Sequence, residues 1–163
     1  MSAKIEVRRA QKEDSTAVGR LINGIQREEF GIPIKLQDQP DLTDIDGFYR
    51  KGAGDFWVAE SSGQIVDTIA LIDIGQGEGA LRKMFVDKDF RGADKGVAIE
   101  LLNRLLVHAT EKGLKRILLG TTAKFLAAHR FYEKNGFDPI NADDLPESFP
   151  RMDVDTRFYQ IDL

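Results

Sequence analysis

Hydrophobic and polar residues alternate along several short stretches of the chain. A period of two residues is typical of β-strands, because successive side chains point to opposite faces of a sheet. Residues 116–122 are instead continuously apolar, as in a strand that is covered on both faces. The turn-forming sequences SSG and GQGEG separate some of these stretches, and GQGEG is expected to be a hairpin turn. The predicted strands are residues 4–10, 55–60, 64–74, 80–86, 116–122 and 155–163.

A different spacing, of three and four residues between apolar positions, follows Asp14. It predicts a helix with one buried face, and Asp14 is a residue type suited to cap its start. The apolar stripe consists of Val18, Leu21, Ile22 and Ile25. Residues 27–50 contain two prolines and two glycines, so we expect a long connection there with one short helix.

Two more helices are predicted in the second half of the chain. The first carries a wide apolar stripe from Val97 to Ala109 and ends at Gly113, where a left-handed residue would stop it. The second covers residues 125–135 and closes at Gly136.

The order of these elements predicts a mixed α/β fold. Antiparallel strands come first, and then one crossover leads from residues 80–86 through a helix to the strand at 116–122. Such a crossover between parallel neighbours is right-handed. We expect a single domain over residues 1–163, with a central, mostly antiparallel sheet of about six to seven strands and helices on both faces.

Composition narrows the classes of protein that the chain can belong to. Its 163 residues can bury a core without a disulfide or metal staple. The net charge of -4 argues against general nucleic-acid binding, and the lack of cysteine excludes disulfides, thiolate metal sites and cysteine nucleophiles. Neither a signal peptide nor the roughly 18 apolar residues of a membrane helix is present. We therefore expect a soluble, cytoplasmic protein that binds neither nucleic acid nor membranes.

The sequence FRGADKGVAIELL, residues 90–102, joins a glycine-bearing loop to the start of the second predicted helix. Free N–H groups in the first turn of a helix attract anions, and Gly92 and Gly96 would let an anion approach them. The spelling fits neither a Walker loop nor a dinucleotide loop. Alone it is equally compatible with an ordinary core helix. Cations that would suit a polyphosphate surround it in the sequence, partly offset by three aspartates: Arg82, Lys83, Lys88, Arg91 and Lys95.

With these residues the chain resembles the GNAT superfamily of acetyl-CoA-dependent N-acetyltransferases over nearly its whole length. FRGADKGVAIELL is similar to the longer form of that family's pyrophosphate loop, with Ala98 at its last position. ALRKMFV is similar to the strand before the loop, whose splayed end receives the pantetheine arm. AAHRFYEKNGF, residues 127–137, closely resembles the family segment A-x-x-F-Y-E-K-x-G-F.

The resemblance implies an acyltransferase that moves acetyl from acetyl-CoA to a primary amine, expected to belong to a small molecule, without a metal. It places Tyr132 where many members have the residue that protonates the departing sulfur. One departure is Asp67 in place of a common glycine, either in the acceptor pocket or, as we expect, in solvent. The implied cofactor-binding residues are Met84, Phe85, Val86, Arg91, Gly92, Lys95, Gly96, Val97, Ala98 and Ala128.

The chemistry of acetyl transfer makes further demands. An alkyl ammonium has a pKa of about 10 and must lose a proton first, but no residue of the sequence identifies the base. The Tyr132 phenol could protonate the thiolate; without the resemblance a core aromatic is the alternative. His108 and His129 have no suitably spaced carboxylate or cysteine partner, so we expect them to serve packing.

Other functions stay open at the level of the sequence. The acidic segment from Glu28 to Asp46 could attract a cationic amine, although acidic loops also serve solubility. A non-catalytic acyl-CoA-binding sensor would use the same pocket, and a homodimer is possible.

Overall fold

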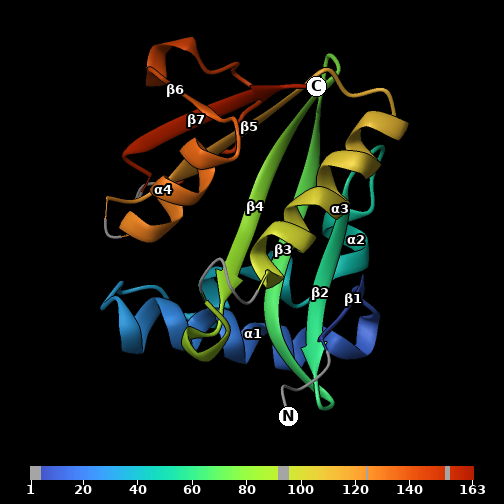
Figure 1. Cartoon of the computed structure of the whole chain (residues 1–163), viewed down its shortest axis with the longest axis vertical. Coiled ribbons are helices and arrows are strands. Elements are labelled where there is room, and N and C mark those ends of the chain that lie inside the picture. The colour runs from blue at the N-terminus through green and yellow to red at the C-terminus, as the bar shows by residue number, and fades with distance from the viewer. Residues whose placement is uncertain (1–4, 92–95, 124, 153–154) are drawn as a thin grey trace.

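Within residues 5–91, 96–123, 125–152 and 155–163, which the computed structural model describes, seven strands form one sheet of order β1-β2-β3-β4-β5-β7-β6 (Figure 1). This order agrees with the prediction of a mixed sheet. The strands are β1 (Ile5–Arg9), β2 (Asp55–Ser61), β3 (Gln64–Gly75), β4 (Glu78–Val86), β5 (Arg116–Thr121), β6 (Asp138–Ile140) and β7 (Arg157–Asp162).

The predicted helices all form. They are α1 (Ser15–Gly24), α3 (Val97–Glu111) and α4 (Leu126–Lys134), and the connection at residues 27–50 contains the expected short helix, α2 (Ile45–Tyr49). A wider, π-type turn over Ile25–Glu29, labelled η2, continues α1. The short helical segments are η1 (Lys12–Asp14), η2 (Ile25–Glu29), η3 (Leu36–Asp38), η4 (Pro40–Leu42), η5 (Lys88–Phe90) and η6 (Ala142–Asp144).

The first half of the sheet is an antiparallel meander of β1, β2, β3 and β4. The GQGEG sequence makes the β3–β4 turn, as predicted. Gly75 and Gly77 there have φ values of 86° and 75°, a region that favours glycine because it has no Cβ. The hairpin alternative to a ligand loop is therefore confirmed at this point of the chain.

The second half of the sheet begins with the predicted crossover. Among the described residues, β4 pairs with β5 in parallel over residues 78–80 and 116–118 alone, and α3 connects the two strands. Beyond these pairs the strands separate, and Figure 1 shows the resulting V between β4 and β5. The other edge of β5 pairs with β7 along its whole length.

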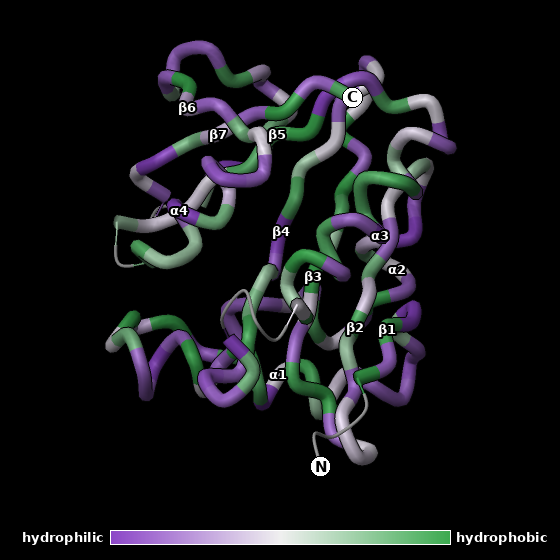
Figure 2. Tube along the Cα trace, in the orientation of Figure 1, coloured by the Kyte–Doolittle hydropathy of each residue, from purple (hydrophilic) through white to green (hydrophobic). Residues whose placement is uncertain are grey.

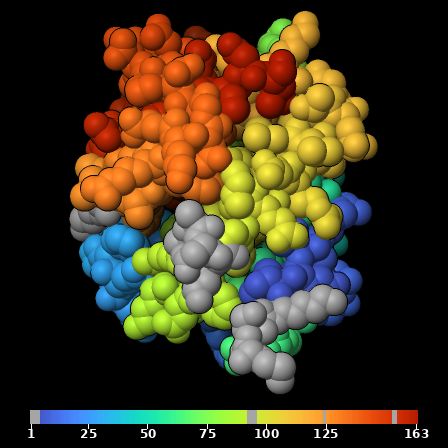
Figure 3. Space-filling model, viewed as in Figure 1, coloured from blue at the N-terminus to red at the C-terminus, as the bar shows by residue number. Residues whose placement is uncertain are grey.

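Helices cover both faces of the sheet, which confirms the predicted fold class. Side chains of α3 and α4 form a hydrophobic cluster with one face, and those of α1 and α2 form another with the opposite face. Figure 3 shows α3 and α4 next to each other on the surface of the first face. Hydrophobic residues run along α3 and β3, whereas the outer loops are mostly hydrophilic (Figure 2).

Two details differ from the predictions. Strand β6 was not predicted, because its three residues are too short for a periodic pattern and include Pro139, which fits only the edge of a sheet. Asp14 does occupy the position before α1, but its side chain does not cap that helix. It accepts hydrogen bonds from Gln11 N and Arg8 Nη1 instead, both at 2.7 Å, because the Arg8 guanidinium is the stronger partner.

Candidate active site

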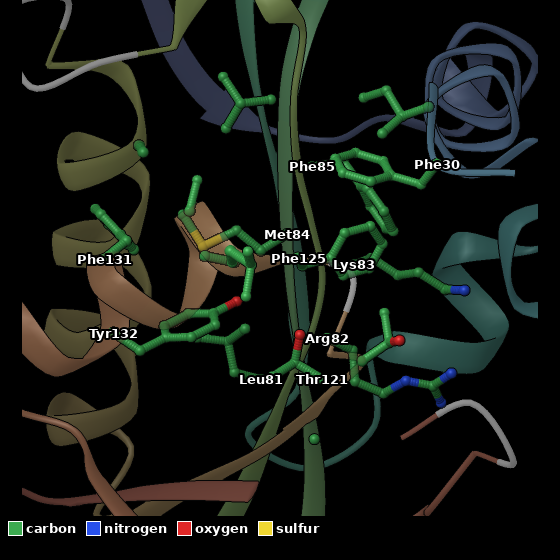
Figure 4. A pocket seen from close by; sticks show the side chains of 18 of the residues that line it. Phe30, Leu81, Arg82, Lys83, Met84, Phe85, Thr121, Phe125, Phe131 and Tyr132 are labelled. Carbon is green, nitrogen blue, oxygen red and sulfur yellow. The ribbon is translucent and has the colours of Figure 1, made fainter. Parts of the chain in front are cut away.

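A cavity of about 800 Å³ lies where β4 and β5 separate (Figure 4). Its walls come from β4, the end of β5, α4, the start of α3 and the segment that follows α1. Because the strands part after residues 80 and 118, the main chain of β4 at residues 81–86 has no partner strand on the β5 side. Residues of both faces of the sheet therefore line one cavity.

A β-bulge in β4 decides which side chains face which side of this cavity. Ala70 pairs with Arg82, whereas Thr68 already pairs with Phe85, so one residue of β3 stands opposite two of β4. Lys83 lies in the bulge with a φ of 54°. Figure 4 shows Arg82 and Lys83 on the same side of the strand, although they are neighbours in the sequence.

The cavity thus has two chemically different sides. On the side that we call the α4 side, Leu81 and Met84 of β4 face Phe131 and Tyr132 of α4 and join the cluster around α3. The opposite side, the α1 side, contains Phe30 and the charged side chains of the bulge. The α4 side is therefore apolar, whereas the α1 side combines aromatic rings with the charges of Arg82 and Lys83.

Tyr132 lies on the α4 side with only 4% of its surface exposed. Phe131 and Phe137 hold the ring in edge-to-face contacts at 5.9 and 5.5 Å between centroids. Its hydroxyl points toward Met84 (Figure 4), and no described residue hydrogen-bonds to it. The hydroxyl is therefore free to donate to a ligand.

Burial raises the pKa of Tyr132 well above its usual range, and the nearby Asp67 carboxyl raises it further. The phenol is consequently protonated at neutral pH and can serve as a donor. The same shift makes the loss of its proton to a thiolate more costly than reference values indicate.

Most of the predicted cofactor-binding residues meet at this cavity. Gly92 and Lys95 lie outside the described residues, and the Val97 side chain is buried in the core at 1% exposure, so only its main chain could face a ligand. The predicted residues that line the cavity are Met84, Phe85, Val86, Arg91, Gly96, Ala98, Ala128 and Tyr132.

The start of α3 presents uncapped main-chain donors. Gly96 precedes the helix with φ 69° and ψ 5°, a left-handed conformation that glycine adopts without strain. Within the described residues no side chain caps this end. The N–H groups of the first turn are therefore available to an anion, as expected for this sequence.

Arg91 is held in place before any ligand binds. Its Nη2 donates to Glu29 Oε2 at 2.8 Å, its Nε donates to the carbonyl of Val86 at 2.9 Å, and its guanidinium carbon lies 5.8 Å from the centre of the Phe30 ring. The hydrogen bonds from Arg91 lower the pKa of Glu29. Arg91 thus links β4 to the segment after α1 at the edge of the cavity.

Lys83, one of the cations near the loop in the sequence, extends to the α1 side of the cavity. Its Nζ lies 2.6 Å from Gln39 Oε1 and 3.8 Å from Asp41 Oδ2, and only 4% of the side chain is exposed. Burial lowers the pKa of Lys83 to about 8, although Asp41 opposes this effect. Asp41 also accepts a short hydrogen bond from the buried Tyr49 hydroxyl. This group was missed because Lys83 is distant in the sequence from Gln39, Asp41 and Tyr49.

Asp67 is fully buried, which contradicts the expectation that it faces solvent. Both faces of β3 are covered in this region, so a polar residue there has no route to water. Neither carboxyl oxygen has a hydrogen-bond partner among the described residues, and burial raises the pKa of Asp67 well above its usual range.

The other polar side chains weighed in the sequence have structural partners. His108 Nε2 contacts the Ala53 carbonyl and His129 Nε2 contacts the Thr122 carbonyl, each at 2.9 Å. In the acidic segment, Asp44 accepts from Gly47 N and Asp46 pairs with Arg50. These acids are engaged within the protein, as Glu29 and Asp41 are.

Among the described residues, no group of histidine and carboxylate side chains is arranged to hold a metal ion. In the same part of the chain, no helix combines the length and apolar character needed to cross a membrane.

Comparison with known proteins gives a family match. Residues 21–137 match the model of the "Acetyltransferase (GNAT) family". Among curated proteins, the chain is 36% identical over 126 residues to an N-acetylaspartate synthetase of Danio rerio, covering 74% of this chain and 44% of that protein. The chain spans less than half the length of this and of similar synthetases from other vertebrates.

Solved structures agree with this match. An acetyltransferase of the GNAT family from Staphylococcus aureus Mu50 superposes with a TM-score of 0.93 at 39% identity, covering 98% of this chain and 99% of the other. The N-acetylglutamate synthase of Neisseria gonorrhoeae, solved with coenzyme A and N-acetylglutamate, has a TM-score of 0.74 at 16% identity and covers 100% of this chain and 36% of the other. The latter similarity is one of fold alone.

Proposed function

The chain belongs to the GNAT family of acetyltransferases, and we propose that it moves the acetyl group of acetyl-CoA directly to the primary amine of a small molecule. The observation that carries this proposal is the cavity between β4 and β5, which is lined from both faces of the sheet. A thioester and an amine can therefore meet from opposite sides. The family match supports an acetyl donor, and the relatives named N-acetylaspartate synthetase support a small acceptor.

In this proposal the coenzyme occupies the α4 side. The free edge of β4 at residues 84–86 offers main-chain groups to a pantetheine arm, which would lie where a neighbouring strand is missing. The N-terminus of α3, with Gly96 and Ala98, faces the same cavity and suits a diphosphate. Gly92 and Lys95 stay predicted contributors to this site.

Acetyl transfer then requires attack by a neutral amine. The amine nitrogen bonds to the thioester carbon, the carbonyl oxygen gains charge, and a main-chain N–H of β4 can stabilise that charge. The nitrogen loses its proton to solvent water, the carbon–sulfur bond breaks, and the departing thiolate takes the phenolic proton of Tyr132. The resulting phenolate then regains a proton from solvent, which its raised pKa favours. The phenol is held near Met84 and is not engaged by another described residue, which suits this role.

Measuring amine-dependent release of free CoA tests the proposal. We expect acetyl-CoA to raise the melting temperature of the protein, and free thiol to appear only when a suitable amine is added. A melting shift without thiol release across a broad amine panel would instead support a non-catalytic acyl-CoA sensor. No melting shift would remove both functions.

Two expectations about cellular location and oligomeric state complete the proposal. We propose that the protein acts in the cytoplasm, which imaging of a tagged chain in its native cell would test. A homodimer also stays a prediction, and light scattering after gel filtration would give the mass of the particle.

A further inference from the structure

The bulge in β4 costs the chain backbone energy and gives the α1 side two adjacent cations. The left-handed region is disfavoured for a residue other than glycine, because the Cβ comes too close to the following carbonyl oxygen, and Lys83 occupies that region with a φ of 54°. In a regular strand, Lys83 would point to the side opposite Arg82. The strained residue thus brings the Lys83 charge to the α1 side of the cavity.

The two cations are not equally compensated. Lys83 has Asp41 as a nearby carboxylate, and Gln39, itself hydrogen-bonded to Gln26, holds its ammonium at 2.6 Å. Lys83 therefore contributes to the positive field of this wall, but its charge is already balanced in part.

Arg82 has no ion-pair partner among the described residues. Its Nη2 contacts the Met152 sulfur at 3.2 Å, and no carboxylate of a described residue lies within ion-pair distance. Asp155 also lines the cavity, but it is not in direct contact with Arg82, and its side chain accepts from Met152 N. Burial raises the pKa of Asp155, and the charges of Arg82 and Lys83 oppose that rise. A guanidinium has five N–H donors in a planar fork that matches a carboxylate, and a thioether is a weak acceptor for one of them.

We propose that the amine acceptor carries a carboxylate group that binds the Arg82 guanidinium, with Lys83 supplying a second positive charge on the same wall. The acceptor is then an amino acid or a related amino carboxylate rather than a polyamine or an aminoglycoside. This inference rests on the proposed acetyl transfer, since it assigns the acceptor to the α1 side of the same cavity.

Substrate pairs that differ in one carboxylate test the inference. The kcat/KM for CoA release is measured with glycine and glycinamide, with alanine and alaninamide, and with β-alanine and β-alaninamide, beside spermidine and an aminoglycoside. We expect the best acceptor to be a carboxylate-bearing amine, preferred by about tenfold or more over its amide partner and over the polycations. Preference for spermidine or the aminoglycoside would overturn the inference while leaving the proposed transferase activity intact.

Variants at position 82 then connect the preference to one side chain. In Arg82→Gln, kcat/KM for the carboxylate substrate should fall about 10- to 100-fold, mainly through KM, while kcat/KM for the amide should change less than about threefold. Arg82→Lys should restore part of the loss because it keeps the charge. Arg20→Gln, an exposed arginine of α1, is the matched control and should leave both values unchanged.

An acid and its amide differ in the pKa of their amines, which by itself changes kcat/KM. This effect cancels when the ratio of kcat/KM for the acid to kcat/KM for the amide is compared between parent and variant. An equal loss for acid and amide in Arg82→Gln, or no loss for either, would overturn the role of Arg82. If Arg82→Gln does not fold, as judged by its melting transition with acetyl-CoA, Arg82→Lys and the substrate panel decide the question. Absence of turnover with every amine would contradict the proposed function itself, and this inference with it.

Discussion

Arg91 Nη2 donates a hydrogen bond to Glu29 Oε2 at 2.8 Å, so the residue that begins the predicted pyrophosphate loop is tied to the segment after α1. A second hydrogen bond joins Nη1 of the same guanidinium to Glu29 Oε1. A carboxylate thus stands beside the site proposed for the diphosphate. An incoming phosphate must share Arg91 with Glu29 or displace it.

Removing this competing charge should strengthen coenzyme binding. We expect Glu29→Gln to lower the acetyl-CoA dissociation constant about two- to fivefold, and Arg91→Gln to raise it about tenfold, because charge-assisted hydrogen bonds are the stronger ones. Titration calorimetry measures both values. Unchanged affinity in both variants would show that Arg91 does not contact the coenzyme.

Loss of the Tyr132 hydroxyl should slow the chemical step. We expect Tyr132→Phe to lower kcat about 100-fold and to change acetyl-CoA affinity less than about twofold, because the ring keeps its packing while the proton donor is lost. Tyr159→Phe removes a neighbouring hydroxyl that donates to Glu133, and it is the matched control. Equal turnover in parent and Tyr132→Phe would exclude the acid role.

Gly96 combines a left-handed backbone with a position at the cavity. We expect Gly96→Ala to cost about 1 kcal/mol, or about 2–4 °C in Tm, and also to weaken acetyl-CoA binding several-fold by disturbing the start of α3. Gly113, which follows the other end of α3, also has a left-handed backbone, with φ 83°, so Gly113→Ala is the matched control. It should lower Tm similarly without weakening acetyl-CoA binding. If both variants bind acetyl-CoA as the parent does, Gly96 is needed for folding alone.

The buried Asp67 predicts a dependence of stability on pH. Burial raises its pKa in the folded protein, so the stability that it contributes is complete below the unfolded pKa near 4 and falls as the pH rises towards the folded value. Each pH unit in that window costs about 1.4 kcal/mol. Asp67→Asn keeps the shape without ionising.

The melting temperatures of parent and Asp67→Asn, followed by calorimetry from acid to neutral pH, give the comparison. Above about pH 4, the melting temperature of Asp67→Asn should rise steadily relative to that of the parent. If the two plots of melting temperature against pH were parallel, the ionised Asp67 carboxylate would have a stabilising partner that offsets the cost of its burial.

Most of the fold could be predicted from local patterns. The alternation at residues 64–74 and 80–86 was enough to predict β3 and β4, and the apolar stripe beginning at Val97 was enough to predict α3. Each of these elements packs against the core, so its burial leaves a periodic pattern in the sequence. Strand β6 escaped prediction because three residues around Pro139 carry no period.

The site was only partly predictable, because its geometry depends on distant partners. Nothing in ALRKMFV shows that one residue of β3 will face two of β4, so the common side of Arg82 and Lys83 could not be foreseen. The burial of Asp67 follows from the helices packed on both faces of β3, not from its neighbours in the sequence. By contrast, a helical motif of adjacent residues carries Tyr132, so its position at the cavity could be predicted, while its role as acid stays a prediction.

Transfer of a labelled acetyl group tests the central claim most directly. The protein is mixed with acetyl-CoA labelled with ¹³C in its acetyl group and with the best amine of the panel, and the products are followed by mass spectrometry. We predict one labelled N-acetyl product for each CoA released, with no label on the protein at any time. Release of CoA with labelled acetate and no labelled amide, or no release at all, would contradict the account.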